Sequence, residues 1–161
     1  MAILTILTQG NPVLKKKSKA VGKILPELKK LIDNMEDTMR AAPGVGLAAP
    51  QVGVLQRVIV VDIGEGLISL INPKIVKKSG KCMFYEGCLS VPGVEGQVER
   101  SESICVKGLD RNGNPVVIEA EGYLAIVLQH EIDHLDGVLF VDRIKDLSRI
   151  KYIKSKKDET I

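Results

Sequence analysis

The sequence predicts an α+β domain in which antiparallel strands surround one central helix, with an N-terminal helix before the strands and a C-terminal helix after them. Three observations predict this class. Apolar residues recur at helical spacing between residues 26 and 40, β-branched segments and glycine turns fill residues 57–121, and residues 123–135 contain helix formers without Gly or Pro. No internal repeat or linker divides the 161 residues, so 1–161 is expected to form a single domain.

The overall composition is that of an ordinary globular domain. Hydrophobic residues make up 45% and charged residues 27% of the chain, and no apolar run approaches the roughly 18 residues of a membrane span. Much of the net charge of +3 collects near the two ends. Aromatic residues are only 3%, with no Trp, so DNA binding is disfavoured. Three cysteines, an odd number, argue against a disulfide framework and favour the reducing cytoplasm.

The first helix is expected from Pro26 to about Arg40. Pro26 suits a first-turn position, and the apolar residues fall three or four apart: Leu28, Leu31, Ile32, Met35 and Met39. The next segment, 42–53, is rich in small residues and prolines, and Gln51 is its only polar side chain. Such a segment allows the backbone to approach closely to another group.

Strands and two further helices are expected in the rest of the chain. The strands are 57–62, 67–72, 74–78 and 81–86, then 101–109 and 115–121, which flank the hairpin signal Asn112-Gly113. Tyr123 to Leu135 is expected to be the central helix, with Gly137 as its C-terminal stop. The last, basic helix is expected from four apolar residues at helical spacing: Ile144, Leu147, Ile150 and Ile153.

The only two histidines of the chain lie in the predicted central helix, in the order His130-Glu131-Ile132-Asp133-His134. Residues four apart leave the same face of a helix, so the two imidazoles can hold one small cation with Glu131 beside them. Two randomly placed histidines would show this spacing, with Glu after the first, in about one case in a thousand. The central helix is therefore expected to bind a metal ion.

Two histidines do not complete a catalytic site, which usually has three protein ligands and one position for water. The candidates for the third ligand are Cys82, Cys88, Cys105, Asp142 and Asp146. Cys88 is favoured because it follows a glycine at the end of a predicted strand, where a side chain and backbone amides can meet. Cys105 alternates with apolar neighbours and is expected in the core.

Three segments together resemble a known family. They are Gly44-Val45-Gly46-Leu47-Ala48-Ala49-Pro50-Gln51, Glu86-Gly87-Cys88-Leu89-Ser90 and Gln129-His130-Glu131-Ile132-Asp133-His134. In this order they resemble the three motifs of the peptide deformylases, and the similarity covers nearly the whole chain. The resemblance implies an enzyme that removes the formyl group from N-formyl-methionine of newly made polypeptides and releases formate.

The resemblance also implies roles for individual residues. One divalent ion, typically Fe²⁺ and replaceable by Zn²⁺, Ni²⁺ or Co²⁺, would be held by Cys88, His130 and His134, with water in the fourth place. Gln51 and the backbone amide of Leu89 would bind the oxyanion, and Glu131 would act as general base and acid. Thiolate and imidazole ligands suit iron or zinc better than magnesium or calcium.

The substrate is expected to place a methionine side chain in a pocket near the ion. Its wall candidates are Val45, Gly46, Ile126 and Val127, although core packing explains the apolar ones equally well. Arg100 is expected to contact the substrate backbone or to pair with Glu86. N-formyl-methionyl peptides are the expected partners. The basic C-terminal segment is a candidate ribosome contact, and the expected compartment is the bacterial cytoplasm or an organelle.

Two other interpretations remain open from the residues alone. A zinc endopeptidase uses the same helical histidine pair with Glu as base, and would recruit a carboxylate such as Asp142 or Asp146 after the helix. A structural zinc site would be non-catalytic, but such sites normally have four protein ligands.

Overall fold

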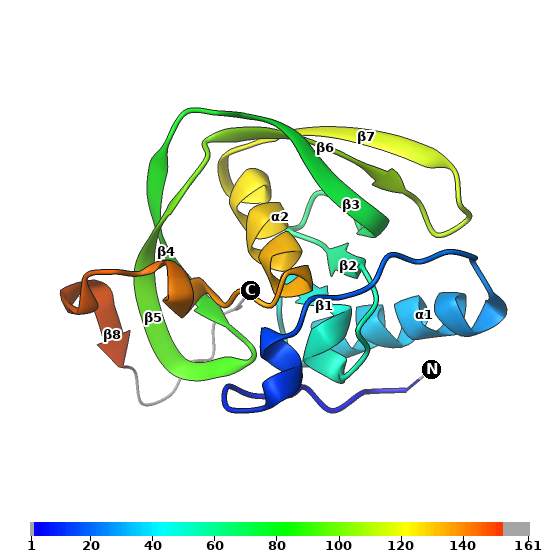
Figure 1. Cartoon of the computed structure of the whole chain (residues 1–161), viewed down its shortest axis with the longest axis horizontal. Helices are drawn as coiled ribbons and strands as arrows, with labels where there is room; N and C mark the ends of the chain where they lie inside the picture. The colour runs from blue at the N-terminus through cyan, green and yellow to red at the C-terminus, as the bar shows by residue number, and fades with distance from the viewer. Residues whose placement is uncertain (1, 153–161) are drawn as a thin grey trace.

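The structure is a computed structural model, and it describes residues 2–152 (Figure 1). Its α-helices are α1 (Pro26–Ala41) and α2 (Gly122–Leu135). Neither helix is long and apolar enough to cross a membrane. The strands are β1 (Gly46–Ala48), β2 (Val58–Val61), β3 (Ile68–Ser79), β4 (Cys82–Cys88), β5 (Val91–Arg100), β6 (Ser103–Leu109), β7 (Pro115–Glu121) and β8 (Ile150–Tyr152).

The strands form two sheets around α2, and every pair of neighbouring strands is antiparallel. The larger sheet has the order β1-β2-β3-β6-β7, and the smaller one has the order β4-β5-β8. Figure 1 shows α2 in the centre, with β3, β6 and β7 arching over it, β1 and β2 beneath it, and β4 and β5 beside it. This arrangement confirms the predicted α+β class with its central helix.

α2 is the core of the molecule because nearly all of its surface is covered. All eleven residues from Ala125 to Leu135 are buried. Val127, Leu128 and Ile132 pack in the largest hydrophobic cluster with side chains from β2, β3, β6 and β7. A helix covered on every side must bury any polar residue that it carries, so those residues need partners or a function.

α1 behaves as its periodicity predicts. Its buried apolar residues, Leu28, Ile32, Met35 and Met39, form one face against β1 and β2 in a second cluster. Pro26 stands at the first turn, and Glu27 is the acidic residue of that turn. This helix closes the side of the larger sheet that α2 does not cover.

Two strand predictions differ from the structure. β3 is one strand where two were predicted, because the pairing with β6 continues past a register shift after Ile71, where Asn72 adopts a positive φ of 53°. β5 was not predicted, because Pro92, Gly93 and Gly96 interrupt the alternation of apolar and polar residues that marks a strand. Gly96 packs closely there: a Cβ would stand 2.3 Å from Ile144 Cδ1 and 3.2 Å from the Arg149 carbonyl oxygen, so a larger residue would require its neighbours to shift.

The predicted C-terminal helix is wrong within the described residues. Leu147–Arg149 form a single 3-10 turn, and Ile150–Tyr152 form β8, which pairs with β5. The carboxylate of Asp146 accepts a hydrogen bond from the Ser148 amide and so starts the tight turn. Leu147, which an amphipathic helix would bury, is 76% exposed. Residues 153–161, including Ile153, lie outside the described residues.

Gly137, predicted as the helix stop, adopts the left-handed conformation (φ +75°) just after α2, and its amide donates to the His134 carbonyl. A Cβ there would lie 2.4 Å from the Lys15 carbonyl oxygen.

We expect Gly137→Ala to lower the free energy of unfolding by about 2 kcal/mol or more, because strain and the backbone clash add. Urea unfolding measures this. Gly22→Ala is the matched control, since its Cβ would meet nothing within 4 Å, and equal losses in both variants would contradict the prediction.

Candidate metal centre

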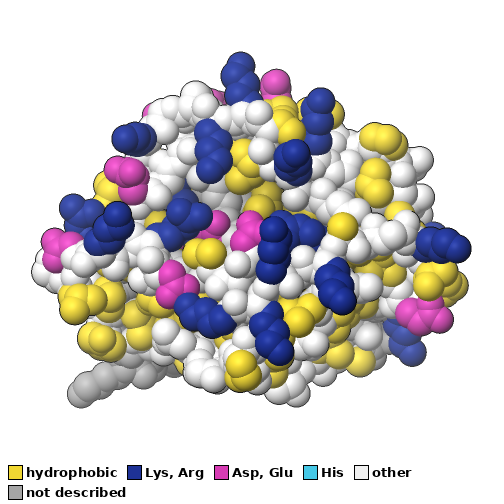
Figure 2. Space-filling model, in the orientation of Figure 1, with side chains coloured by type: hydrophobic (Ala, Val, Ile, Leu, Met, Phe, Trp, Pro, Cys, Tyr) yellow, Lys and Arg dark blue, Asp and Glu magenta, His cyan; other side chains and the backbone are white. Residues whose placement is uncertain are grey.

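α2 carries both histidines and Glu131 into the interior between the two sheets. His130 and His134 are each 1% exposed and Glu131 is 0% exposed. Accordingly, no histidine side chain is visible on the face shown in Figure 2. The two imidazole rings leave the same face of the helix, with 5.0 Å between their centroids.

The β4–β5 hairpin brings Cys88 to this face of α2. Cys88 is the last residue of β4 and lies opposite Val91, so Leu89 and Ser90 form the turn between the strands. Its Sγ lies 3.3 Å from His134 Nε2. One ligand atom each from Cys88, His130 and His134 lie within 4.8 Å of one another. This arrangement can hold one ion with three protein ligands and leaves a further position open.

The other candidate ligands lie away from this group. Asp142 accepts hydrogen bonds from a lysine ammonium and from the Leu139 amide, and Asp146 caps the last 3-10 turn. Cys82 and Cys105 are half-buried free thiols and are not part of the group. The prediction that Cys105 lies in the core is wrong, because its two neighbours on β6 take the inner face of the sheet.

The chemistry of the buried donors fits a divalent cation. His130 Nε2 and both carboxylate oxygens of Glu131 are buried without a hydrogen-bond partner among the described residues. Burial, and then the charge of Glu86, raise the pKa of Glu131. Burial, and then the charge of Glu131, raise the pKa of Cys88. A divalent ion between these two groups would stabilise both as anions, since a coordinating thiol is deprotonated.

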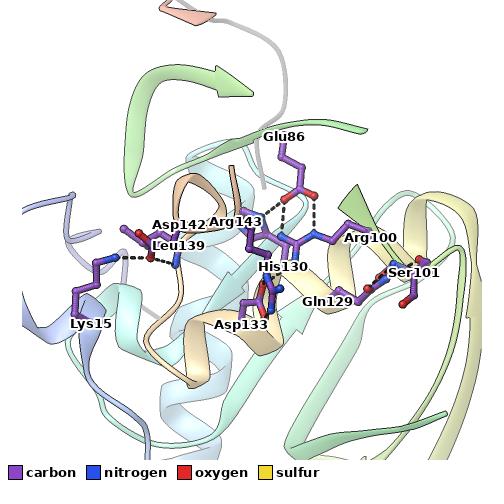
Figure 3. A network of polar contacts seen from close by, with 11 residues as sticks. Lys15, Glu86, Arg100, Ser101, Gln129, His130, Asp133, Leu139, Asp142 and Arg143 are labelled. Carbon is purple, nitrogen blue, oxygen red and sulfur yellow. Dashed lines mark hydrogen bonds and ion pairs between the residues drawn. The ribbon is translucent and has the colours of Figure 1, made fainter. Parts of the chain in front are cut away.

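A buried charge network orients His130 from behind (Figure 3). Glu86 Oε1 lies 2.8 Å from His130 Nδ1, which favours the tautomer that carries the proton on Nδ1 and leaves Nε2 free for a metal. Arg100 donates to both Glu86 oxygens at 2.7 and 2.8 Å and to Asp133 at 2.6 Å. Arg143 also donates to Asp133, at 2.7 Å through Nη2.

From the sequence, Glu86 was predicted only as a possible partner of Arg100. It was not predicted that Glu86 would also contact and orient His130. Burial alone would raise the pKa of Glu86, but hydrogen bonds from Arg100 and His130 outweigh burial and lower the pKa to about 2. Glu86 therefore stays ionised against His130. The available signal was its position two residues before Cys88, because alternate strand residues share one face.

Gln51 is held beside the metal ligands. It is 0% exposed, its Oε1 accepts from the Ala48 amide at 2.9 Å, and its Nε2 donates to Ser90 Oγ at 3.0 Å. The same Nε2 lies 3.6 Å from Cys88 Sγ. Leu89 follows Cys88 directly and begins the turn between β4 and β5, so its backbone amide is adjacent in sequence to a candidate metal ligand.

The predicted pocket residues divide into two groups. Gly46 lies directly against the Glu131 carboxylate, since a Cβ on Gly46 would stand 2.5 Å from Glu131 Oε2. Val45 and Val127 belong to the largest hydrophobic cluster, as core packing predicts. Ile126 is 4% exposed, lies one turn before His130, and belongs to none of the three clusters of the described residues.

Arg100 pairs with Glu86, the second of the two roles expected for it, and the pair is buried. We expect Arg100→Leu to lower the free energy of unfolding by about 3–5 kcal/mol, because it leaves the buried Glu86 carboxylate without its guanidinium partner and with only the His130 contact. Urea unfolding at neutral pH measures this. Arg143→Leu is the control: its side chain is 44% exposed, so screening limits the loss to about 1 kcal/mol. Equal losses would contradict the prediction.

The chain is similar to known proteins over nearly its full length. The family model described as polypeptide deformylase matches residues 3–150. The peptide deformylase of Carboxydothermus hydrogenoformans is 54% identical over 149 residues, which cover 92% of this chain and 98% of that protein. The one from Halothermothrix orenii is 56% identical over 146 residues, which cover 89% and 95%.

Solved structures agree with these sequence matches. The crystal structure of a peptide deformylase from Legionella pneumophila is 49% identical with a TM-score of 0.89, covering 92% of this chain and 89% of that one. The Ehrlichia chaffeensis peptide deformylase in complex with actinonin is 43% identical with a TM-score of 0.89, covering 92% of each chain. With the Cys-His-His group, the buried glutamate and these matches, the chain belongs to the polypeptide deformylase family.

Proposed function

We propose that this protein hydrolyses the formamide at the N-terminus of N-formyl-methionyl polypeptides and releases formate. The observation that carries the proposal is the buried carboxylate of Glu131, which has no hydrogen-bond partner in the described part of the chain, beside three converging ligand atoms. A charged group that burial disfavours is retained where a reaction needs it. Family membership supports the same substrate class.

The metal ligands of the proposal are Cys88 Sγ, His130 Nε2 and His134 Nε2. The His130 nitrogen is free because Nδ1 faces Glu86, and the His134 nitrogen is the one nearest to the sulfur. The ion would be Fe²⁺ in the cell, with Zn²⁺, Ni²⁺ or Co²⁺ able to replace it. When bound, the ion supplies Lewis-acid activation of the carbonyl and of water.

Glu131 would move the protons of the reaction. Both of its oxygens are buried without a hydrogen-bond partner among residues 2–152, and Gly46 lies against them without a side chain, so the carboxylate keeps its capacity to bond to water or substrate. Burial raises its pKa, which makes it a better base for water and a better acid for the departing amine. One carboxylate thus takes a proton from water and later delivers it to the amine.

Gln51 Nε2 and the Leu89 amide would donate to the oxygen of the tetrahedral intermediate. We expect Gln51→Leu to lower kcat by about 10²–10³-fold, the usual cost of one oxyanion donor, with no change in metal content. Formate release and elemental analysis measure the two quantities. Gln56→Leu, at an exposed position, is the control. A kcat within about threefold of the parent would contradict the role.

Substrate would be held along two open strand edges. β1 and β4 are edge strands of different sheets, and Gly46 of β1 and Cys88 of β4 both flank Glu131. An extended peptide can pair its main chain with such edges, which suits an enzyme that acts on many sequences. Ile126, which belongs to none of the clusters of the described residues, is the proposed wall for the methionine side chain, and Val45 and Val127 pack in the largest cluster.

The cellular setting of the proposal is the bacterial cytoplasm, where nascent chains emerge. The ribosome is a proposed partner through the basic C-terminal segment. Within the described residues, this segment exposes Lys145, Arg149 and Lys151. On the face shown in Figure 2, Lys and Arg side chains are spread widely. Unchanged co-sedimentation with ribosomes after truncation at Ser148 would contradict this contact.

The test is anaerobic formate release from formyl-Met-Ala-Ser, with unformylated Met-Ala-Ser and an internal-peptide substrate as controls. We expect formate from the first only. Cleavage of the internal peptide would favour the endopeptidase alternative, and metal-loaded protein without formate release would contradict the proposal. A structural zinc site is disfavoured because the grouping of potential ligands within residues 2–152 contains three members, whereas closed sites have four.

A further inference from the structure

A cavity of about 170 Å³ is lined by Arg100 and Asp133 of the buried network and by none of the metal ligands. Residues from β3, the β3–β4 turn, β5, α2 and the 3-10 turn Phe140–Arg143 form its walls. This volume is enough for several water molecules or one small ion. Its polar lining includes Lys78, Lys81, Arg100, Ser101, Asp133 and Arg143.

Positive charge dominates this cavity. Four cationic side chains line it, with two carboxylates, Glu99 and Asp133. Asp133 is already occupied, since it accepts hydrogen bonds from both guanidinium groups (Figure 3). Neither Lys78 nor Lys81 forms an ion pair, with nitrogen and oxygen within 4.0 Å, to a carboxylate of residues 2–152.

The donors converge because of the β3–β4 turn. Gly80 adopts a φ of +72° and reverses the chain, so Lys78 before the turn and Lys81 after it both line the cavity. Arg143 uses Nε and Nη2 on Asp133, which leaves Nη1 for another acceptor. Arg100 and Asp133 are 4% and 9% exposed and are held by hydrogen bonds, so they form a fixed floor of the cavity. The Arg100 donors are already used on Glu86 and Asp133, which leaves Lys78, Lys81 and Arg143 Nη1 to meet a ligand.

We propose that this cavity binds a small tetrahedral oxyanion of the inorganic phosphate or sulfate class. Such an ion has acceptor oxygens in several directions and matches donors that arrive from several elements, whereas a planar carboxylate has two. Lys binds phosphate as a point charge and Arg binds it through its fork of N–H groups. The bound ion would tie the β3–β4 turn to α2, so it stabilises the fold without occupying the metal centre.

The test is a titration of the zinc-loaded full-length protein with inorganic phosphate at constant ionic strength, followed by amide chemical shifts in NMR. We expect saturable shifts at Gly80, Lys81 and Ser101 with a dissociation constant of about 1 mM or tighter. The double variant Lys78→Ala, Lys81→Ala should weaken binding by at least about tenfold. The thermal midpoint should rise with phosphate in the parent and not in the double variant.

The control removes the same charge elsewhere: Lys74→Ala, Lys107→Ala, two exposed and directly paired positions of β3 and β6. This control should bind phosphate within about twofold of the parent.

Equal weakening in both double variants, shifts that grow linearly without saturation, or shifts confined to residues around Cys88 and His134 would each overturn the proposal. Saturation by a short RNA but not by free phosphate would also overturn it, because the site would then serve a polymer. Deformylase activity does not enter this readout, so its failure and that of the proposed function are distinguishable.

Discussion

Glu131→Gln is expected to lower kcat for formyl-Met-Ala-Ser by about 10³-fold while metal content and fold are retained. An amide of the same shape fills the space against Gly46, where a Cβ would already stand 2.5 Å from Glu131 Oε2. It cannot accept a proton from water or return one to the amine. The variant also removes a buried charge that has no hydrogen-bond partner within residues 2–152, so the free energy of unfolding should not fall.

Steady-state kinetics, elemental analysis and urea unfolding measure the three quantities on one preparation. Glu121→Gln, the same chemical change at the exposed N-cap of α2, is the matched control and should retain full activity. If Glu131→Gln kept activity within about tenfold of the parent, another group would be the base. If it lost the metal, Glu131 would be a ligand and the base would have to be found elsewhere.

Cys88→Ala is expected to remove the ion from the purified protein and to abolish formate release. Loss of a partner outside the ligand set typically weakens metal affinity by about 10–100-fold, and loss of one ligand of three should exceed that. The remaining imidazoles keep their positions because α2 and Glu86 hold them, so the loss reflects the missing sulfur. Dialysis against a weak chelator followed by elemental analysis provides the measurement.

Cys82→Ala and Cys105→Ala are the matched controls for Cys88→Ala. Both thiols are half-buried and lie outside the ligand group, so both variants should retain about one ion per chain. Retention of the ion by Cys88→Ala would place the third ligand elsewhere, and Asp142 and Asp146 would return as candidates. That result would favour the endopeptidase alternative over the deformylase assignment.

The accuracy of the sequence predictions followed the range of the interactions involved. α1 and α2 were predicted nearly to the residue, because periodicity, Pro26 and Gly137 act within a few positions of the chain. The C-terminal helix failed because β5 competes for the same segment, and Gly96 of β5 lies far away in sequence. β5 itself was missed because its glycines serve packing against distant residues rather than local alternation.

The metal centre also divides into features that local sequence predicts and features that distant contacts decide. The sequence by itself determined that His130 and His134 share one face of a helix with Glu131 beside them, because helical geometry depends on spacing alone. Only the tertiary structure decided which cysteine joins them and that Arg100, Asp133 and Glu86 form one buried network behind His130. These outcomes depend on how β4 and β5 pack against α2. Contacts between segments that are 30 to 50 residues apart arise from the register of strands and the shape of the core, which no local pattern encodes.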